Sequence, residues 1–276
     1  MTQRELISIA DPDSDTSAAI APWRGALVTS FKVRGQDVLY LDRETFDDPQ
    51  KNVRGGIPIL FPSPGKLTDD RWHCDGRSGA MKQHGFARTK VWDAIARRPH
   101  SVTLQLESDA ETLAQYPWAF RAVFEVSVSA SRLRLDMTIE NRDQRPMPFA
   151  FGYHPYFAVD RKAKSTITSD ATRVFDNVTK KAEPFDGRFD LTREELDLHL
   201  LDQTAHYMTL RREEGGEIEV CASDDFAYWV VWSVKGKGFV CVEPWTSPPN
   251  ALNGGERLLR LGVGERWRAV VEVGFR

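Results

Sequence analysis

The sequence predicts a single all-β domain, large and antiparallel, with few short helices. Three observations lead to this prediction. Apolar and polar residues alternate over much of the chain, convincing helical periodicity is scarce, and no Gly/Ser linker, repeat or low-complexity tract divides the 276 residues. Alternation with a period of two is typical of strands that bury one face. A chain of this length is long for one domain but within the range of β-sandwiches and barrels.

Regular alternation marks the individual strands. In chain order, strands are expected at residues 101–107, 120–129, 133–140, 227–234, 238–245 and 267–275. Within 133–140 every second side chain is apolar, so these side chains share one face, and residues 130–132 are expected to form the turn of a hairpin. Short helices are expected only at 109–116 and 192–201, and residues 1–19 are expected to be a loosely ordered N-terminal segment.

Composition excludes several classes of partner. A formal net charge of −3 gives no electrostatic reason to expect nucleic acid or an anionic membrane. The three cysteines, Cys74, Cys221 and Cys241, are odd in number and unpatterned, which favours a reducing compartment over a disulfide framework. The N-terminus has no apolar signal core, and no stretch reaches the ~20 apolar residues that span a bilayer. We therefore expect a cytoplasmic protein with a small-molecule ligand; the sequence does not indicate its oligomeric state.

The motif FGYHPYFAVD places a histidine at an unusual backbone position. The residue before a proline is driven toward extended geometry, so His154 is expected at or near the end of a strand. In that strand the aromatic side chains share one face, and the other face carries only Ala150, Gly152 and His154. This second face is nearly empty, and a hollow beside an imidazole could hold a ligand.

The motif GFVCVEPW ends a strand on a carboxylate. Both faces of residues 238–242 are apolar, which indicates a buried strand, and Glu243 follows it directly before a proline. A buried carboxylate without a partner is unstable, so Glu243 either pairs with a surface arginine or lines a wet cavity. Because His154 and Glu243 both end strands before prolines, a two-residue acid–base site is favoured.

Three further motifs carry polar side chains. In VRGGIPILFPSPG, Arg54 precedes paired glycines. The segment is either a stiff loop whose backbone closely approaches another group, or a structural turn with a solvated arginine. In KQHGFARTKVW, His84 and Arg88 are four residues apart, but a glycine interrupts any helix. The motif WHCDG lacks a second ligand cluster at metal-site spacing, so no metal is expected, and His199 forms no recognisable ligand pair.

Four motifs, RGGIPILFP, QHGFAR, FGYHPYF and CVEPWTSPPNALN, together resemble the aldose 1-epimerase (mutarotase) family. Within it they are most similar to the branch that contains hexose-6-phosphate mutarotases, and the similarity runs from about residue 20 to the C-terminus. The family fold is a large antiparallel β-sandwich of the galactose mutarotase type. The resemblance implies an isomerase that interconverts the α and β anomers of an aldose without a cofactor.

The resemblance also assigns roles to individual residues. His154 matches the family's general acid and Glu243 its general base; an unperturbed histidine, with a pKa of about 6.5, can supply a proton near neutral pH. The substrate contacts fall on Arg54, His84 and Arg88, and the aspartate that holds sugar hydroxyls on Asp202, with Asp186 and Asp190 as alternatives. Two arginines on one small ligand favour a phosphorylated or otherwise acidic aldose unless Glu243 pairs with one of them.

Two other functions remain open at this stage. A non-catalytic sugar or sugar-phosphate binding protein could use the same fold and site. A glycoside hydrolase would normally need two carboxylates that flank the scissile bond, and only Glu243 is well placed.

Overall fold

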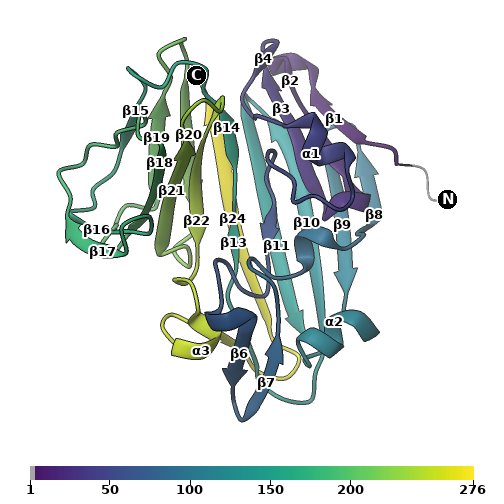
Figure 1. Cartoon of the computed structure of the whole chain (residues 1–276). Coiled ribbons are helices and arrows are strands. Elements are labelled where there is room, and N and C mark those ends of the chain that lie inside the picture. The colour runs from purple at the N-terminus through teal and green to yellow at the C-terminus, as the bar shows by residue number, and fades with distance from the viewer. Residues whose placement is uncertain (1–3) are drawn as a thin grey trace.

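The computed structural model describes residues 4–276 and confirms the all-β prediction (Figure 1). Two eight-stranded sheets share one hydrophobic core, and their paired strands are antiparallel. The first sheet has the order β15 (Thr166–Thr168), β19 (Tyr207–Arg211), β20 (Glu217–Ala222), β24 (Arg266–Phe275), β11 (Arg132–Asn141), β10 (Phe120–Ser129), β9 (Ser101–Glu107) and β8 (Asp93–Arg98). The second has the order β17 (Lys181–Pro184), β16 (Arg173–Asp176), β18 (Glu195–Leu200), β21 (Tyr228–Val234), β22 (Phe239–Trp245), β13 (Gly152–Tyr153) and β5 (Ile59–Leu60), and β14 (Tyr156–Ala158) also pairs with β22.

Smaller elements surround these two sheets. A four-stranded sheet holds β1 (Ile7–Asp11), β2 (Thr16–Ala21), β3 (Leu27–Val33) and β4 (Gln36–Asp37), and two-stranded sheets pair β6 (Arg71–Cys74) with β7 (Arg77–Ala80) and β12 (Met147–Phe149) with β23 (Leu259–Leu261). The α-helices are α1 (Arg43–Asp47), α2 (Ala110–Gln115) and α3 (Ala251–Gly254), and 3₁₀ turns occur at Pro12–Ser14, Pro22–Arg24, Thr68–Asp70 and Ala87–Thr89. Within the described part of the chain, every helix is too short or too polar to cross a membrane.

The first sheet follows the predicted alternation closely. β9 and β10 have the predicted bounds, and the apolar side chains of β11 are all buried at positions 133, 135, 137 and 139. Ala130 and Ser131 join β10 to β11 with φ values of 47° and 62°, as a two-residue hairpin turn of type I′ requires. The predicted helix at 109–116 is confirmed as α2, whose capping box uses Asp109 and Thr112.

Two sequence predictions are wrong. Residues 1–19 were expected to be loosely ordered, but β1 and β2 pair in register over residues 7–11 and 16–20 and bury Ile7 and Ile9 in the core; residues 1–3 lie outside the described part. The segment 192–201 was expected to be helical, but it forms β18 between β16 and β21. Pairing on both sides supplies β18 with backbone hydrogen bonds that override the local helical preference of its glutamates and leucines.

The strand β22 is buried on both faces, as predicted. Val240 and Val242 point into the shared core, whereas Cys241, Glu243 and Trp245 point to the other face of the second sheet. This other face is therefore where polar side chains of β22 can meet a ligand.

Candidate active site

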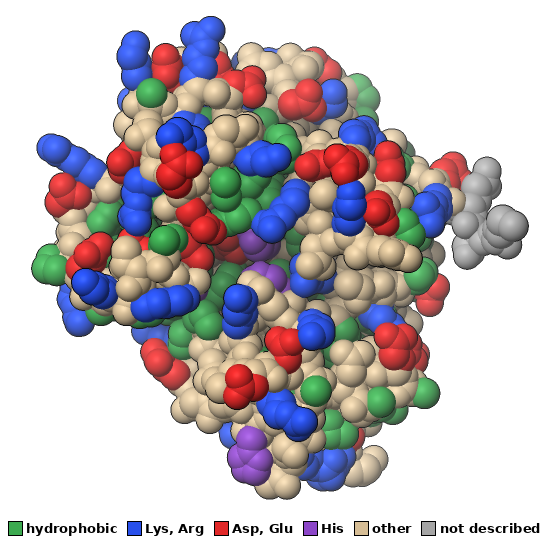
Figure 2. Space-filling model, viewed as in Figure 1, with side chains coloured by type: hydrophobic (Ala, Val, Ile, Leu, Met, Phe, Trp, Pro, Cys, Tyr) green, Lys and Arg blue, Asp and Glu red, His purple; other side chains and the backbone are tan. Residues whose placement is uncertain are grey.

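A cavity of about 540 Å³ lies on the outer face of the second sheet. Figure 2 shows it as a hollow near the centre of the molecule, with histidine side chains inside and charged side chains around the rim. Its floor comes from β18, β21 and β22, and its walls include residues 52–54, 65–66 and 83–88. This volume is typical of small-molecule sites, which run from about 300 to 1,000 Å³.

Strand register gathers the polar side chains of the floor. Glu243 on β22 lies opposite Val230 on β21, and Val230 lies opposite His199 on β18. One pair further along, Trp232 lies opposite Asp197. Because alternate residues of a strand share a face, these five side chains all point into the cavity.

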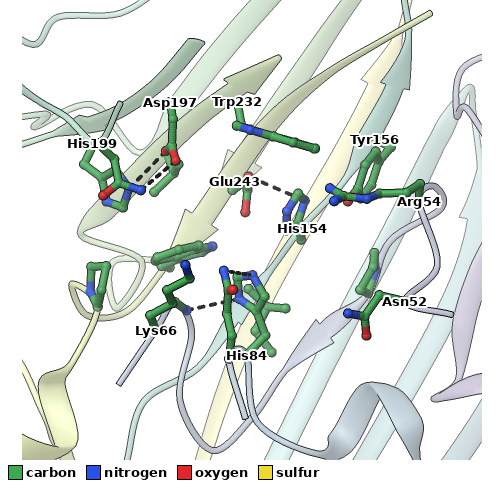
Figure 3. A pocket seen from close by; sticks show the side chains of 18 of the residues that line it. Asn52, Arg54, Lys66, His84, His154, Tyr156, Asp197, His199, Trp232 and Glu243 are labelled. Atoms are coloured by element: carbon green, nitrogen blue, oxygen red, sulfur yellow. Dashed lines mark hydrogen bonds and ion pairs between the residues drawn. The ribbon is translucent and has the colours of Figure 1, made fainter. Parts of the chain in front are cut away.

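His154 enters the cavity from the break between β13 and β14. Pro155 interrupts the strand there, and the backbone N–H of His154 donates to the carbonyl of Pro58 at 3.1 Å. The imidazole stacks on Tyr156, with ring centroids 4.7 Å apart and an interplanar angle of 6°. Its Nδ1 lies 3.5 Å from Oε1 of Glu243, so the two residues predicted as an acid–base pair are in contact (Figure 3).

The hollow predicted beside Ala150, Gly152 and His154 is not empty. A Cβ atom built on Gly152 would lie 2.6 Å from Cδ1 of Trp245, so this indole already fills the space above the glycine. Ala150 is fully buried, and only His154 of the three lines the cavity. The glycine is needed because Trp245, rather than a ligand, packs against the strand.

Several polar atoms at the cavity floor lack partners. Oε2 of Glu243, Nδ1 of His154 and Nε1 of Trp245 are buried and accept or donate no hydrogen bond within residues 4–276. Buried polar groups are nearly always satisfied in folded proteins, and exceptions often mark sites where a ligand supplies the partner. The hydroxyl groups of a sugar could do so here.

Burial shifts the pKa values of the pair in opposite directions. Glu243 is 2% exposed, and burial, together with the charge of Asp197, raises the pKa of its carboxyl well above the usual range. Burial, followed by the charges of Arg88 and Arg54, lowers the pKa of His154 to about 3. The expectation of a histidine pKa near neutral pH is therefore wrong for this structure, because burial favours the uncharged forms of both His154 and Glu243.

One side of the cavity carries cations without carboxylate partners. The Arg54 guanidinium lies 5.0 Å from the centroid of the Trp232 ring, and Nη2 of Arg88 donates to the backbone carbonyl of Gln83 at 2.9 Å. Among residues 4–276, neither arginine has a carboxylate within 4.0 Å, and Lys66 lines the same cavity. The alternative that Glu243 neutralises one of the arginines is not observed, because its ion-pair contact is with His154.

His84 also reaches the cavity, where its hydrogen bonds fix its tautomer. Its Nδ1 accepts the backbone N–H of Gly65 at 3.1 Å, which leaves the proton of a neutral imidazole on Nε2. Burial, with the neighbouring His154 and Arg88 next in effect, lowers the pKa of His84 well below its usual value. Nε2 of His84 also lies 3.1 Å from the side-chain amide of Gln83, and its N–H can donate to the oxygen of that amide or to a ligand oxygen.

Asp202 does not reach this site. Its carboxylate accepts the backbone N–H groups of Thr172 and Arg173 at 2.9 and 3.0 Å, and it is not among the cavity-lining residues. The aspartate that lines the cavity is Asp197, on the opposite wall from Arg54 (Figure 3). The prediction that Asp202 belongs to this site is therefore not supported by its position.

Asp197 belongs to a fully connected network. Its carboxylate accepts from Nδ2 of Asn177 at 2.7 Å and lies 3.2 Å from Nε2 of His199, whose Nδ1 in turn lies 2.9 Å from the hydroxyl of Tyr228. Burial alone would raise the pKa of Asp197, but the hydrogen bonds from His199 and Asn177 outweigh it and lower the pKa. Asp197 is thus an ionised acceptor facing the cavity.

A signal for Asp197 and His199 was present in the sequence. Residues 195–200 read Glu-Leu-Asp-Leu-His-Leu, a strict alternation that places all three leucines on one face and the polar residues on the other. In β18 the leucines are buried in the shared core, and the polar face lines the cavity. Interpretation of the segment as a short helix concealed this pattern.

Comparisons with known proteins extend over nearly the whole chain. A family model described as aldose 1-epimerase matches residues 5–274. The chain is similar to a protein of Cenchrus ciliaris named "Putative glucose-6-phosphate 1-epimerase", at 27% identity over 272 residues that cover 88% of this chain and 77% of that protein.

Solved structures show the same fold. The Slr1438 protein of Synechocystis sp. PCC 6803 superposes with a TM-score of 0.96 at 36% identity, over 99% of this chain and 96% of that one. A galactose mutarotase-like protein of Lactobacillus casei has a TM-score of 0.81 at 24% identity, over 99% of this chain and 100% of that one. The cavity-lining residues all fall within the segment that the family model matches.

Proposed function

Since this chain belongs to the aldose 1-epimerase family and is therefore an isomerase that acts on a sugar, we propose that it interconverts the anomers of a hexose 6-phosphate. The observation that carries the proposal is the contact between His154 and Glu243. Two groups that can exchange protons lie 3.5 Å apart at the floor of a sugar-sized cavity, and Nδ1 of His154 and Oε2 of Glu243 have no hydrogen-bond partner within residues 4–276.

The chemistry requires two coupled proton transfers. To open a hemiacetal ring, a base removes the proton of the O1 hydroxyl while an acid protonates the ring oxygen O5; rotation about C1–C2 and reclosure give the other anomer. We assign Glu243 as the base and His154 as the acid. Opening converts a carboxylate and an imidazolium into a carboxylic acid and a neutral imidazole, and reclosure reverses the transfer. One pair therefore serves both directions.

The charge state of the pair depends on the ligand. The form in which both residues are uncharged contains as many protons as the ion pair that begins ring opening, so the two forms differ only in which residue holds the proton. Arg88 and Arg54 contribute to lowering the pKa of His154. An anion bound between these arginines would offset their charge and favour the imidazolium. A substrate phosphate would thus help to prepare the acid.

The unneutralised cations favour a phosphorylated substrate. Two guanidinium groups that approach one small ligand repel each other unless an anion lies between them, and their fork-shaped donor geometry matches a phosphate dianion. Lys66 adds a third positive charge at the same cavity. On the other wall, ionised Asp197 would accept hydrogen bonds from sugar hydroxyls, and His84 would donate to a hydroxyl oxygen.

The test compares a sugar 6-phosphate with the same free sugar. We expect Arg88→Ala to lower kcat/KM by about 10–100-fold for glucose 6-phosphate, but by far less for glucose, because a charge-assisted contact contributes about 1.5–3 kcal/mol. Exchange between anomers can be followed by NMR, with Arg97→Ala, an exposed arginine of β8, as the control. Added salt should weaken only the phosphorylated substrate. Better turnover of free glucose or galactose by the wild type, with no selective salt effect, would refute the phosphate assignment.

A further inference from the structure

A cysteine lies beside the acid–base pair and has no role in the proposed reaction. Cys241 precedes Glu243 by two residues on β22, so both side chains point to the same face of the sheet. Cys241 is fully buried and packs against Tyr156 and Phe239. His154, Cys241 and Glu243 each offer one potential metal-ligand atom, and these three atoms lie within 4.8 Å of one another.

These three residues offer the donor atoms that zinc prefers. Thiolate sulfur, imidazole nitrogen and carboxylate oxygen bind zinc at about 2.0–2.3 Å, so ligand atoms around one tetrahedral ion lie about 3.3–3.7 Å apart. The contact of 3.5 Å between His154 and Glu243 already has this spacing, and the thiol needs to approach by about 1 Å, within the reach of small side-chain rotations. The cavity beside the pair leaves a fourth coordination position open to water.

The unpartnered atoms point to a ligand independently of the spacing. Nδ1 of His154 and Oε2 of Glu243 are buried without hydrogen-bond partners in the described chain. Glu243 is 98% buried, and both residues line the open cavity, which provides an entry path. A cation bound by Nδ1 of His154 and by both oxygens of the Glu243 carboxylate would give each of these two atoms a partner.

The charges of the set also balance. A thiolate and a carboxylate together neutralise a divalent cation, so the bound ion adds no net charge near Arg54 and Arg88. Binding releases the proton of the Cys241 thiol and the proton that His154 and Glu243 share, and both pass to solvent; no electron transfer is involved. A thiolate ligand further selects zinc or cadmium over magnesium and calcium, which prefer oxygen ligands.

We propose that His154, Cys241 and Glu243 form a site for zinc or a similarly thiophilic divalent cation, and that the bound ion reversibly inhibits the isomerase. Inhibition follows because the ion occupies the facing atoms of the two residues to which the proposed function assigns proton transfer. Sugar and ion should therefore exclude each other.

Direct binding is tested with cadmium, whose bond to a thiolate absorbs in the ultraviolet. Chelator-treated wild-type protein should bind one Cd²⁺ per chain at a site that depends on Cys241, and Cys241→Ser should lose this absorption. Cys221→Ser is the matched control, since Cys221 lies on β20 in the other sheet and contacts Glu219. Its absorption at the Cys241 site should be unchanged. Absence of the band in the wild type, or its persistence in Cys241→Ser, overturns the proposal without any reference to activity.

Inhibition is tested with Zn²⁺ in the same variants. Zn²⁺ should inhibit wild-type anomer exchange competitively with sugar, EDTA should restore it, and Cys241→Ser should weaken the inhibition by at least about tenfold, because it removes one direct ligand. Metal-free Cys241→Ser should retain turnover, which separates metal inhibition from loss of the isomerase. If this variant does not fold, Cys241→Ala replaces it. Equal Zn²⁺ inhibition of the wild type and the cysteine variant would refute the three-residue site.

Discussion

Two carboxylate–histidine pairs lie on two sides of one cavity, along the same face of the second sheet, and they differ in how completely they are satisfied. On the wall formed by β13, β14 and β22, Glu243 and His154 lie 3.5 Å apart, and Nδ1 of His154 and Oε2 of Glu243 have no hydrogen-bond partner in the described chain. On the wall formed by β18 and β21, Asp197 and His199 lie 3.2 Å apart, and hydrogen bonds from Asn177 to Asp197 and between Tyr228 and His199 complete the network (Figure 3).

The difference separates proton transfer from ligand positioning. Burial raises the pKa of Glu243, whereas hydrogen bonds to Asp197 overcome the effect of burial and lower its pKa. A group that exchanges protons must be able to hold the proton or release it, but a group that orients hydroxyls should stay ionised throughout the reaction. Two acids whose environments push their pKa values apart are a recurring sign of such a division of roles.

The largest expected effect comes from Glu243→Gln. Glutamine keeps the shape of the side chain but is a negligible base, so kcat should fall by about 10²–10⁴-fold while KM changes little. The unfolding temperature should stay equal or rise, because the change removes a buried, poorly satisfied acid. Anomer exchange by NMR and a thermal melt measure both quantities. A turnover near that of the wild type would mean that Glu243 is not the base.

His154→Asn should have the next largest effect. An amide cannot deliver a proton to O5, so kcat should fall by about 10²-fold or more, the range seen for loss of a general acid. Retention of the fold is checked by circular dichroism, since the ring also stacks on Tyr156. If the double variant with Glu243→Gln is no slower than Glu243→Gln alone, the two residues act as one unit, as we expect.

The same carboxylate-to-amide change on the other wall should behave differently. Asp197→Asn should raise KM and lower kcat by no more than about tenfold, because it weakens positioning and leaves the acid–base pair intact. It should also lower the unfolding temperature, since an amide NH₂ would face one of the donors from Asn177 and His199. The loss of unfolding free energy should be about 1–3 kcal/mol.

The stability difference should depend on pH with a defined sign. The pKa of Asp197 is lower in the folded chain, so its contribution is present above the unfolded pKa of about 3.9 and is lost as the pH falls through the folded value. The gap in unfolding temperature between wild type and Asp197→Asn should therefore narrow below about pH 4. A gap that widens on acidification would contradict the ionised state of Asp197.

The two walls also differ in how well the sequence predicts them. His154 and Glu243 each precede a proline, and this local constraint is visible without tertiary information, although β22 continues past Glu243 to Trp245. Asp197 and His199 lie in a stretch rich in glutamate and leucine, which also suits a helix, and only pairing with β16 and β21 makes it a strand. The sequence therefore predicts the pair that proline marks and misses the pair that depends on sheet pairing.

Contacts between distant segments explain the other failures. Gly152 was expected to leave a hollow, but Trp245, far away in the sequence, packs against it. Asp202 was a reasonable candidate by position, yet its carboxylate accepts hydrogen bonds from the backbone N–H groups of Thr172 and Arg173. The paired glycines of the RGGIPILFP motif do bring backbones close together, because a Cβ on Gly56 would lie 2.4 Å from the carbonyl of Val28. That close approach is to the protein itself.

The dependence of kcat/KM on pH, measured with a free sugar, tests the protonation behaviour of the pair His154 and Glu243. Because burial and the neighbouring arginines lower the pKa of His154 to about 3, kcat/KM for glucose should show no decline around pH 6.5, where an ordinary histidine titrates. His154 should gain a proton only as the pH falls toward about 3, and burial should move the loss of the Glu243 proton to a higher pH than for an ordinary carboxyl. A limb near pH 6.5 with glucose would contradict this. Glucose 6-phosphate should add its own limb at about pH 6 from the phosphate.

The smallest expected effect comes from Tyr228→Phe, which removes one hydrogen bond from the satisfied network. The lost hydroxyl meets Nδ1 of His199 at 2.9 Å, and a typical neutral hydrogen bond contributes about 0.5–1.5 kcal/mol, so KM should rise by about 2–10-fold. The effect reaches the sugar through His199 and Asp197, so kcat and the pH profile should stay as in the wild type. Steady-state anomer exchange with glucose separates KM from kcat. A tenfold or larger fall in kcat with unchanged KM would show that this wall takes part in proton transfer, and the division of roles between the two pairs would then fail.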